Sequence, residues 1–161
     1  MLATPDVFGR EAATKELHRI ANWWLDRSPD ETNGGFLGEI DFHGNPVPGA
    51  TKGIILNSRI LWFFSELALF DDDTRYRGAA DRAFNYLLDY FDDPEYGGAV
   101  WELATDGSVA NGKKQVCAQC FCIYAFAAYY RLTYNPRALT KALEYFGRLE
   151  STALDRKYGG F

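Results

Sequence analysis

The most constraining feature of this sequence is an internal repeat with a period of about sixty-two residues. The dipeptide Gly34-Gly35 recurs as Gly97-Gly98 and again as Gly159-Gly160, and each pair follows an aspartate by four residues. Other positions match at almost the same offset: Glu39 with Glu102, Lys52 with Lys114, Asn57 with Gln119, Trp62 with Tyr124, and Phe84 with Phe146. An ordered series at a nearly constant offset predicts repeat units over about 7–71, 74–133 and 136–161.

Each unit is predicted to contain an amphipathic helix, a hairpin and an apolar helix, in that order. In the first unit, residues 7–26 place apolar side chains at three- and four-residue steps, as an amphipathic helix requires. Residues 36–42 alternate apolar and polar side chains before His43-Gly44-Asn45, which predicts a short hairpin. Residues 53–71 are apolar on almost every side, which predicts a helix that is buried all round.

The second unit repeats this order with helices over 74–92 and 113–133, around a hairpin over 98–109 that turns at Asp106-Gly107. A fifth helix, over 136–152, opens the third unit. Alternation of half-exposed and buried helices is typical of two concentric layers. We therefore predict an all-α fold, one partial α/α toroid domain over 1–161 with about two and a half helix pairs. Its inner helices run the same way, so the hairpin loops gather around their N-termini and form the mouth of any pocket.

Composition excludes several classes of partner. The net charge of −5 provides no basic surface for nucleic acid or anionic lipid, and no apolar run is long enough to span a membrane. The N-terminus lacks the pattern of a secretory signal, and three cysteines within 117–122 cannot form a disulfide framework, so we expect a cytoplasmic protein. No nucleotide- or metal-binding motif is present, and we expect no cofactor. Aromatic residues reach 16%, which suits a large core and also a pocket that stacks on sugar rings.

Two segments give the chain a family likeness. Asn33-Gly34-Gly35-Phe36-Leu37-Gly38, followed by the stretch from Lys52 to Trp62 (KGIILNSRILW), resembles the opening of the N-acylglucosamine 2-epimerase superfamily, above all its cellobiose 2-epimerase branch. The second unit agrees, with Lys114 and then Cys117-Ala118-Gln119-Cys120-Phe121, and the likeness extends from about residue 15 to 161. The resemblance implies an (α/α)6 barrel that epimerises or isomerises sugars next to the carbonyl. The family's catalytic histidines lie in later units, beyond the part that this chain matches.

Three residues are candidates for contact with a substrate. Arg59 lies in the almost wholly apolar helix 53–71, where an unpaired charge is costly, and its repeat partner is Phe121. It matches the arginine with which family members hold substrate oxygens; the alternative is an internal salt bridge to Glu39 or Glu66. Cys117 stands where the family usually places a tyrosine that lines the pocket, and Trp101 lies on the second hairpin near the expected mouth.

Other conspicuous residues have structural interpretations. Cys117 and Cys120 are spaced to share one apolar helix face, which favours core packing over redox or zinc chemistry. Glu39 and Glu102 recur in successive units, which favours a framework role over a glycosidase pair. A third group comprises turn aspartates, aromatics expected to pack between helices, and two isolated histidines that are poor candidates for a base: Asp30, Asp93, Asp155, Trp62, Tyr124, His18 and His43.

The sequence therefore favours a sugar 2-epimerase or aldose–ketose isomerase that acts on a mono- or disaccharide. Such an enzyme removes the proton at C2 of the opened sugar, forms an enediolate and returns a proton. The 161 residues offer no base at the expected mouth, so we expect them to be inactive alone. The alternatives are a glycoside hydrolase on the same barrel, a non-catalytic remnant that binds sugar or a partner, and association of two chains through the open apolar flank of the toroid.

Overall fold

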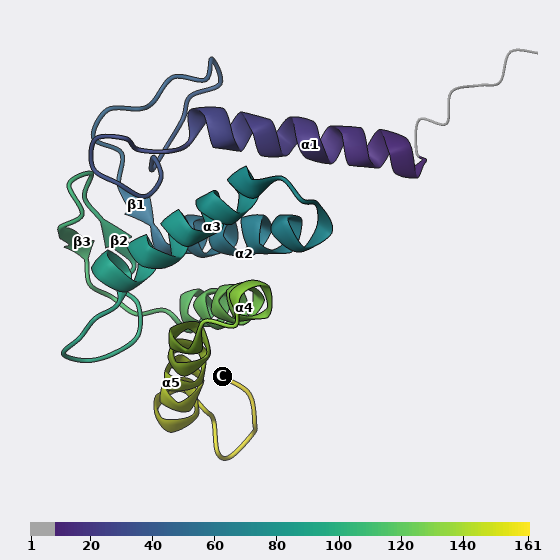
Figure 1. Ribbon diagram of the computed structural model, residues 1–161. Helices are drawn as coiled ribbons and strands as arrows, with labels where there is room; N and C mark the ends of the chain where they lie inside the picture. The colour runs from purple at the N-terminus through teal and green to yellow at the C-terminus, as the bar shows by residue number, and fades with distance from the viewer. Residues whose placement is uncertain (1–8) are drawn as a thin grey trace, which may run out of the picture.

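Five helices and a small sheet make up the fold in the computed structural model, which describes residues 9–161 (Figure 1). The helices are α1 (Arg10–Arg27), α2 (Ile54–Phe70), α3 (Thr74–Tyr86), α4 (Val116–Thr133) and α5 (Pro136–Thr152). A π-helical turn, η1 (Leu87–Phe91), extends α3. These bounds confirm the five predicted helices to within a few residues. The first predicted helix begins at Val7, which lies outside the described residues.

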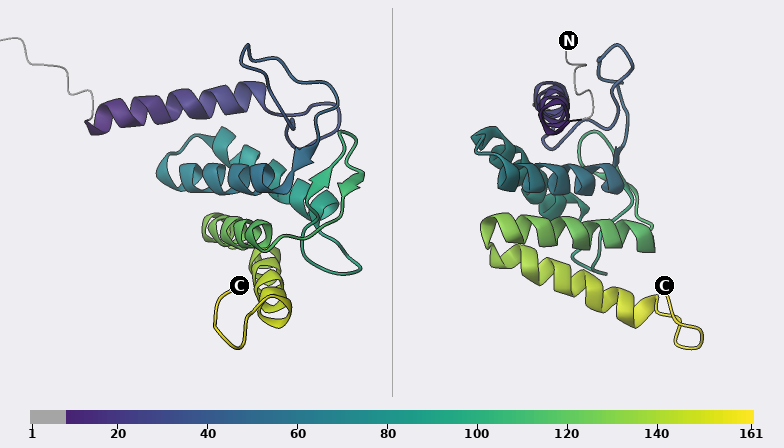
Figure 2. Two further views of the ribbon diagram at one scale, coloured as in Figure 1. Left: turned by 180° about the vertical axis from the view of Figure 1, so that it is seen from behind. Right: turned by 90° about the vertical axis from the view of Figure 1, so that its right-hand side faces the viewer.

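The helices form two layers, as the repeat predicts. The inner helices α2 and α4 lie side by side, and the outer helices α3 and α5 pack on α2 and α4 respectively (Figure 2). The core between the layers is built largely from aromatic and small residues, with Phe84 of α3 stacked on Tyr129 of α4 at 4.3 Å between ring centroids. Outer helix α1 differs from its equivalents, because Ala21 is the one buried residue among its 18.

A three-stranded antiparallel sheet joins the first two units at the loop end of the molecule. Its order is β1 (Lys52–Gly53), β2 (Glu102–Leu103) and β3 (Val109–Asn111). Strands β2 and β3 confirm the hairpin expected over 98–109. The hairpin expected in the first unit is reduced to a single bridge between Ile40 and Pro46, and β1 instead pairs across the repeat with β2.

The paired glycines allow close packing at the turns of the first two units. Gly35 has a φ of +63°, and a Cβ built on it would lie 2.6 Å from the Tyr86 ring. Gly98, its equivalent, has a φ of +73°, and its Cβ would lie 2.8 Å from Oε1 of Gln119. A side chain at either position would be strained and would also clash, so glycine is required there.

Candidate functional site

The inner helices expose one face, which we call the inner face and define by Arg59 and Trp62 of α2 and by Cys117, Cys120 and Tyr124 of α4. On α4 these residues project opposite the buried Ala118, Cys122 and Phe126, at the 3.6-residue period of a helix. The expectation that both inner helices are buried on every side is therefore wrong for the described residues. The sequence shows that a helix is apolar, but the burial of that helix depends on its neighbours. Helices α2 and α4 pack on each other and on the outer helices α3 and α5, and these contacts leave the inner face uncovered.

Arg59 is exposed on this face and makes no ion pair within residues 9–161. Of the two carboxylates considered as partners, Glu66 instead lies 2.9 Å from Nη1 of Arg131. Arg59 also borders a cavity of about 420 Å³ between α1 and α2. The remaining lining is apolar: Ile20, Trp24, Ile55, Leu56, Ile60, Trp62 and Phe63. Among the described residues that line this cavity, the guanidinium of Arg59 is thus the one charged group, and its donors are available to a ligand.

The cysteines divide between the two faces of α4. Cys117 and Cys120 are exposed and Cys122 is buried, and burial raises the pKa of the Cys122 thiol. The expectation that Cys117 and Cys120 pack in the core is therefore wrong. They do share one face, as their spacing requires, but it is the inner face, and it is open.

Trp101 lies at the N-terminal end of α2. Its carbonyl accepts a hydrogen bond from the backbone N–H of Ile54, and its own N–H donates to the carbonyl of Asn111. The ammonium of Lys113 lies 4.7 Å from the centre of the indole ring, a cation–π contact. The cross-repeat pairing of β1 with β2 thus brings this candidate from the second unit to the start of the helix that carries Arg59.

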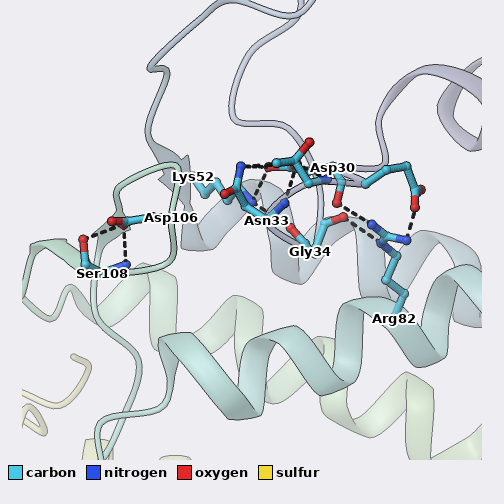
Figure 3. Close-up of polar contacts among 10 residues, drawn as sticks. Asp30, Asn33, Gly34, Lys52, Arg82, Asp106 and Ser108 are labelled. Atoms are coloured by element: carbon cyan, nitrogen blue, oxygen red, sulfur yellow. Dashed lines mark hydrogen bonds and ion pairs between the residues drawn. The ribbon is translucent and has the colours of Figure 1, made fainter.

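A buried ion pair fixes the loop that precedes α2 (Figure 3). Lys52 has no exposed surface, and its Nζ lies 2.8 Å from Oδ2 of Asp30 and 2.7 Å from the carbonyl oxygen of Gly34. Burial alone would raise the pKa of Asp30, but hydrogen bonds from Lys52 and Asn33 outweigh it and lower that pKa to about 2. Arg82 of α3 ties the same loop to the outer layer by donating to the carbonyl oxygens of Gly35 and Asp30.

The ion pair recurs in the second unit, where Lys114 contacts Asp93. The hydrogen bond from Lys114, followed by that from the Tyr96 N–H, lowers the pKa of Asp93 to about 2. The third aspartate, Asp155, accepts the N–H groups of Lys157 and Tyr158 in the same way. These contacts confirm the aspartates as turn residues. Sequence reasoning missed their pairing with lysines, although both members of each pair recur at nearly the same offset.

The other candidate groups do not converge on the inner face. Nε2 of His18 in α1 lies 2.7 Å from Oδ2 of Asp71, and the His43 ring packs at a tilt against Phe42 in the first loop. Glu39 is exposed in that loop, whereas Glu102 lies in β2. No cluster of three or more His, Cys, Asp or Glu side chains within residues 9–161 is arranged to hold a metal ion. In the same part of the chain, no helix combines the length and hydrophobicity needed to cross a bilayer.

Comparison with known proteins establishes first the class of fold and then the family. The solved structure of cellobiose 2-epimerase from Spirochaeta thermophila superposes with a TM-score of 0.84 at 30% identity, over 98% of this chain and 40% of that one. A family 76 α-mannanase from Bacteroides thetaiotaomicron shares the fold, with a TM-score of 0.71 at 21% identity. The fold is therefore that of an α/α toroid, as the repeat predicts, and of the (α/α)6 type, as the family resemblance implies.

The sequence places the chain within a family of sugar epimerases. Residues 35–161 match the family model of N-acylglucosamine 2-epimerase, and the chain belongs to that family. It is 39% identical over 153 residues to the cellobiose 2-epimerase of Bacteroides fragilis, and 36% identical over 148 residues to that of Eubacterium cellulosolvens. These matches cover 94% and 91% of this chain but 39% and 36% of the relatives, so the chain spans about two fifths of their length.

Proposed function

We propose that this chain forms part of a sugar 2-epimerase or aldose–ketose isomerase that transfers a proton at C2 through an enediolate. Support comes from membership of the N-acylglucosamine 2-epimerase family and from relatives named cellobiose 2-epimerase. The reaction needs a cation or hydrogen-bond donors beside the oxygen that becomes negative as the C2 proton leaves. It also needs a base with a pKa near neutrality, which neither His18 nor His43 supplies on the inner face.

In this proposal Arg59 binds the carbonyl oxygen of the opened sugar and stabilises the enediolate. The observation that carries the assignment is an exposed guanidinium on a largely apolar inner helix, with no carboxylate partner within residues 9–161. Arginine stays protonated and presents several donors in one plane, so it suits two neighbouring sugar oxygens. Cys117, on the same face, and Trp101, at the start of α2, are proposed as further contacts of the sugar.

The proposal predicts that the isolated chain is inactive, because the base lies outside these residues. When the isolated chain is incubated with cellobiose, mannose or N-acetylglucosamine in deuterated water, the sugar should incorporate no deuterium at C2 beyond the rate in buffer alone. If the sugar does exchange, and if Cys117→Ser or Lys114→Ala abolishes that exchange, a base lies within these residues and the expectation is contradicted.

A hybrid enzyme tests Arg59 in a catalytic setting. Residues 9–161 would replace the matching segment of the Bacteroides fragilis cellobiose 2-epimerase. Arg59→Ala in that hybrid should lower turnover of cellobiose by about 10²-fold or more, the usual cost of losing one donor to a developing oxyanion. Arg156→Ala, in an exposed turn, serves as the matched control. An active hybrid that tolerates Arg59→Ala would refute the role given to this residue.

A further inference from the structure

Trp62 and Tyr124 form an aromatic pair across the two inner helices. They occupy equivalent positions of successive repeats, and their rings stack with centroids 5.3 Å apart and planes inclined by 26°. The contact confirms the predicted packing between helices. Tyr124 nevertheless keeps 53% of its surface exposed, whereas Phe126 and Tyr129 on the same helix keep 1% and 5%. Its ring is therefore half outside the core, with one side held by Trp62.

The pair lies next to Arg59 on the inner face. Trp62 follows Arg59 by three residues, which is a rise of about 4.5 Å along α2. Farther along the same two helices, Glu66 lies one turn beyond Trp62 and forms an ion pair with Arg131, about two turns beyond Tyr124. From the loop end inward, the face thus presents a cation with no ion-pair partner among residues 9–161, then an exposed aromatic ring, then a closed ion pair.

We infer that the exposed ring of Tyr124, backed by Trp62, is the surface on which the sugar ring stacks while Arg59 binds its oxygens. A pyranose has an apolar face of C–H groups and a rim of hydroxyls, so it needs a flat apolar surface beside hydrogen-bond donors. The π-face of an aromatic ring carries partial negative charge, which attracts C–H groups. This inference rests on the proposed function and adds to it the residue that recognises a cyclic sugar.

A purely structural role for the pair gives a different expectation. If Trp62 and Tyr124 only join α2 to α4, truncation of Tyr124 lowers the thermal stability and leaves sugar binding unchanged. The inner helices also share the buried core cluster that contains Leu61, Phe64 and Ala125, so an exposed side chain is not needed to hold them together. Tyr124→Met separates the two roles, because methionine keeps helix propensity and apolar volume but has no flat ring.

The experiment titrates the full chain with cellobiose and follows amide chemical shifts by NMR, with circular dichroism as the check of folding. Tyr124→Phe should keep the wild-type affinity, and Tyr124→Met should weaken binding by about tenfold. Tyr134→Met, at an exposed position beyond the end of α4, is the matched control and should have no effect. Trp62→Leu is the second variant, and it should weaken binding through the lost support of Tyr124.

One further ligand, sorbitol, and one further variant, Arg59→Gln, make the outcomes distinct. Sorbitol carries hydroxyls without a ring, so its weak binding should depend on Arg59 and not on Tyr124. If Arg59→Gln weakens cellobiose binding and folded Tyr124→Met does not, the inference is overturned and the proposed function stands. If the wild-type chain gives no shift changes with cellobiose on α2 or α4, both the inference and the sugar site are overturned.

Discussion

At the scale of single residues, the best-defined interaction is the ion pair of Lys52 with Asp30. A lysine without exposed surface is tolerated because three groups surround its ammonium: the Asp30 carboxylate, the Gly34 carbonyl and, at 4.9 Å, the ring of Tyr86. Its repeat equivalent, the pair of Lys114 with Asp93, is partly exposed. The chain therefore contains the same interaction at two levels of burial, and the two can be compared directly.

Removal of the lysine should cost far more in the first unit than in the second. Lys52→Met leaves the Asp30 carboxylate buried and unpaired, and we expect the free energy of unfolding to fall by about 3 kcal/mol or more. Lys114→Met removes a partly exposed pair and should cost about 1 kcal/mol. Urea unfolding followed by circular dichroism measures both. Equal losses in the two variants would contradict the role given to burial.

Acid should destabilise the protein through the same carboxylates. The pKa of Asp30 is lowered to about 2 in the folded chain, from an ordinary value of 3.8. The stability from this pair is therefore fully present above about pH 4 and lost as the pH falls towards 2, on the order of 2 kcal/mol. Urea unfolding at successive pH values should show this loss, and Asp30→Asn should flatten that part of the profile. An unchanged slope in Asp30→Asn would show that other groups carry the acid sensitivity.

At the scale of elements, local sequence predicts what depends on local pattern. The periodicity of apolar residues predicts five helices, and Asp106-Gly107 predicts the turn between β2 and β3, because both signals lie within the segments that they describe. Strand β1 was not predicted, since Lys52-Gly53 has no strand pattern and is extended by pairing with residues fifty positions later. The π-helical turn at Leu87–Phe91 likewise has no signal in the periodicity.

The same distinction applies to the candidate site. The mismatch between Arg59 and the apolar helix around it is visible in the sequence, and the structure leaves that side chain exposed. The open inner face was not predicted, because exposure of Cys117 and Cys120 depends on which helices stand opposite them. Hydrophobicity alone cannot distinguish an apolar wall around a cavity from the interior of a core.

Helix α1 should be the least stable helix. One residue of α1 is buried, compared with four in α5, its equivalent in the third unit. Lys141 and Tyr145 of α5 also bind Asp92, which anchors that helix to the preceding turn. In hydrogen exchange followed by NMR, the amides of α1 should exchange well before those of α5, because local opening exposes little apolar surface. Equal protection of the two helices would contradict this expectation.

At the scale of the whole molecule, the described residues have two apolar edges. One is the cavity between α1 and α2, with Ile20 38% exposed at its rim. The other is a stripe on α5, where Leu139, Leu143 and Phe146 remain exposed at three- and four-residue spacing. Contiguous apolar surface of this kind favours association. The two edges lie at opposite ends of the row of helices (Figure 1).

We predict that the isolated chain associates with itself through the stripe on α5. Light scattering after gel filtration should give a mass that rises above 18.2 kDa with protein concentration. Leu143→Glu places a charge at a side chain that is 61% exposed and should return the protein to a monomer. Tyr158→Glu, at an exposed residue outside the stripe, is the control and should associate like the wild type. A monomer at every concentration would contradict the prediction.

The helices that pack together are not the helices that belong to one sequence repeat, and this has a consequence for proteins that arise by duplication of the repeat. A sequence unit contains an outer helix and the inner helix that follows it, yet α3 packs on α2 and α5 on α4, so each outer helix rests on the inner helix of the unit before. A duplication of whole units therefore leaves the first outer helix without the preceding inner helix that supports its equivalents, and it leaves the last inner helix without an outer helix to cover it. The unsupported outer helix and the uncovered inner helix are complementary, and both remain whatever the number of repeat units. Closure into a ring packs the first outer helix on the last inner helix. Packing therefore favours a closed ring over an open array of these units.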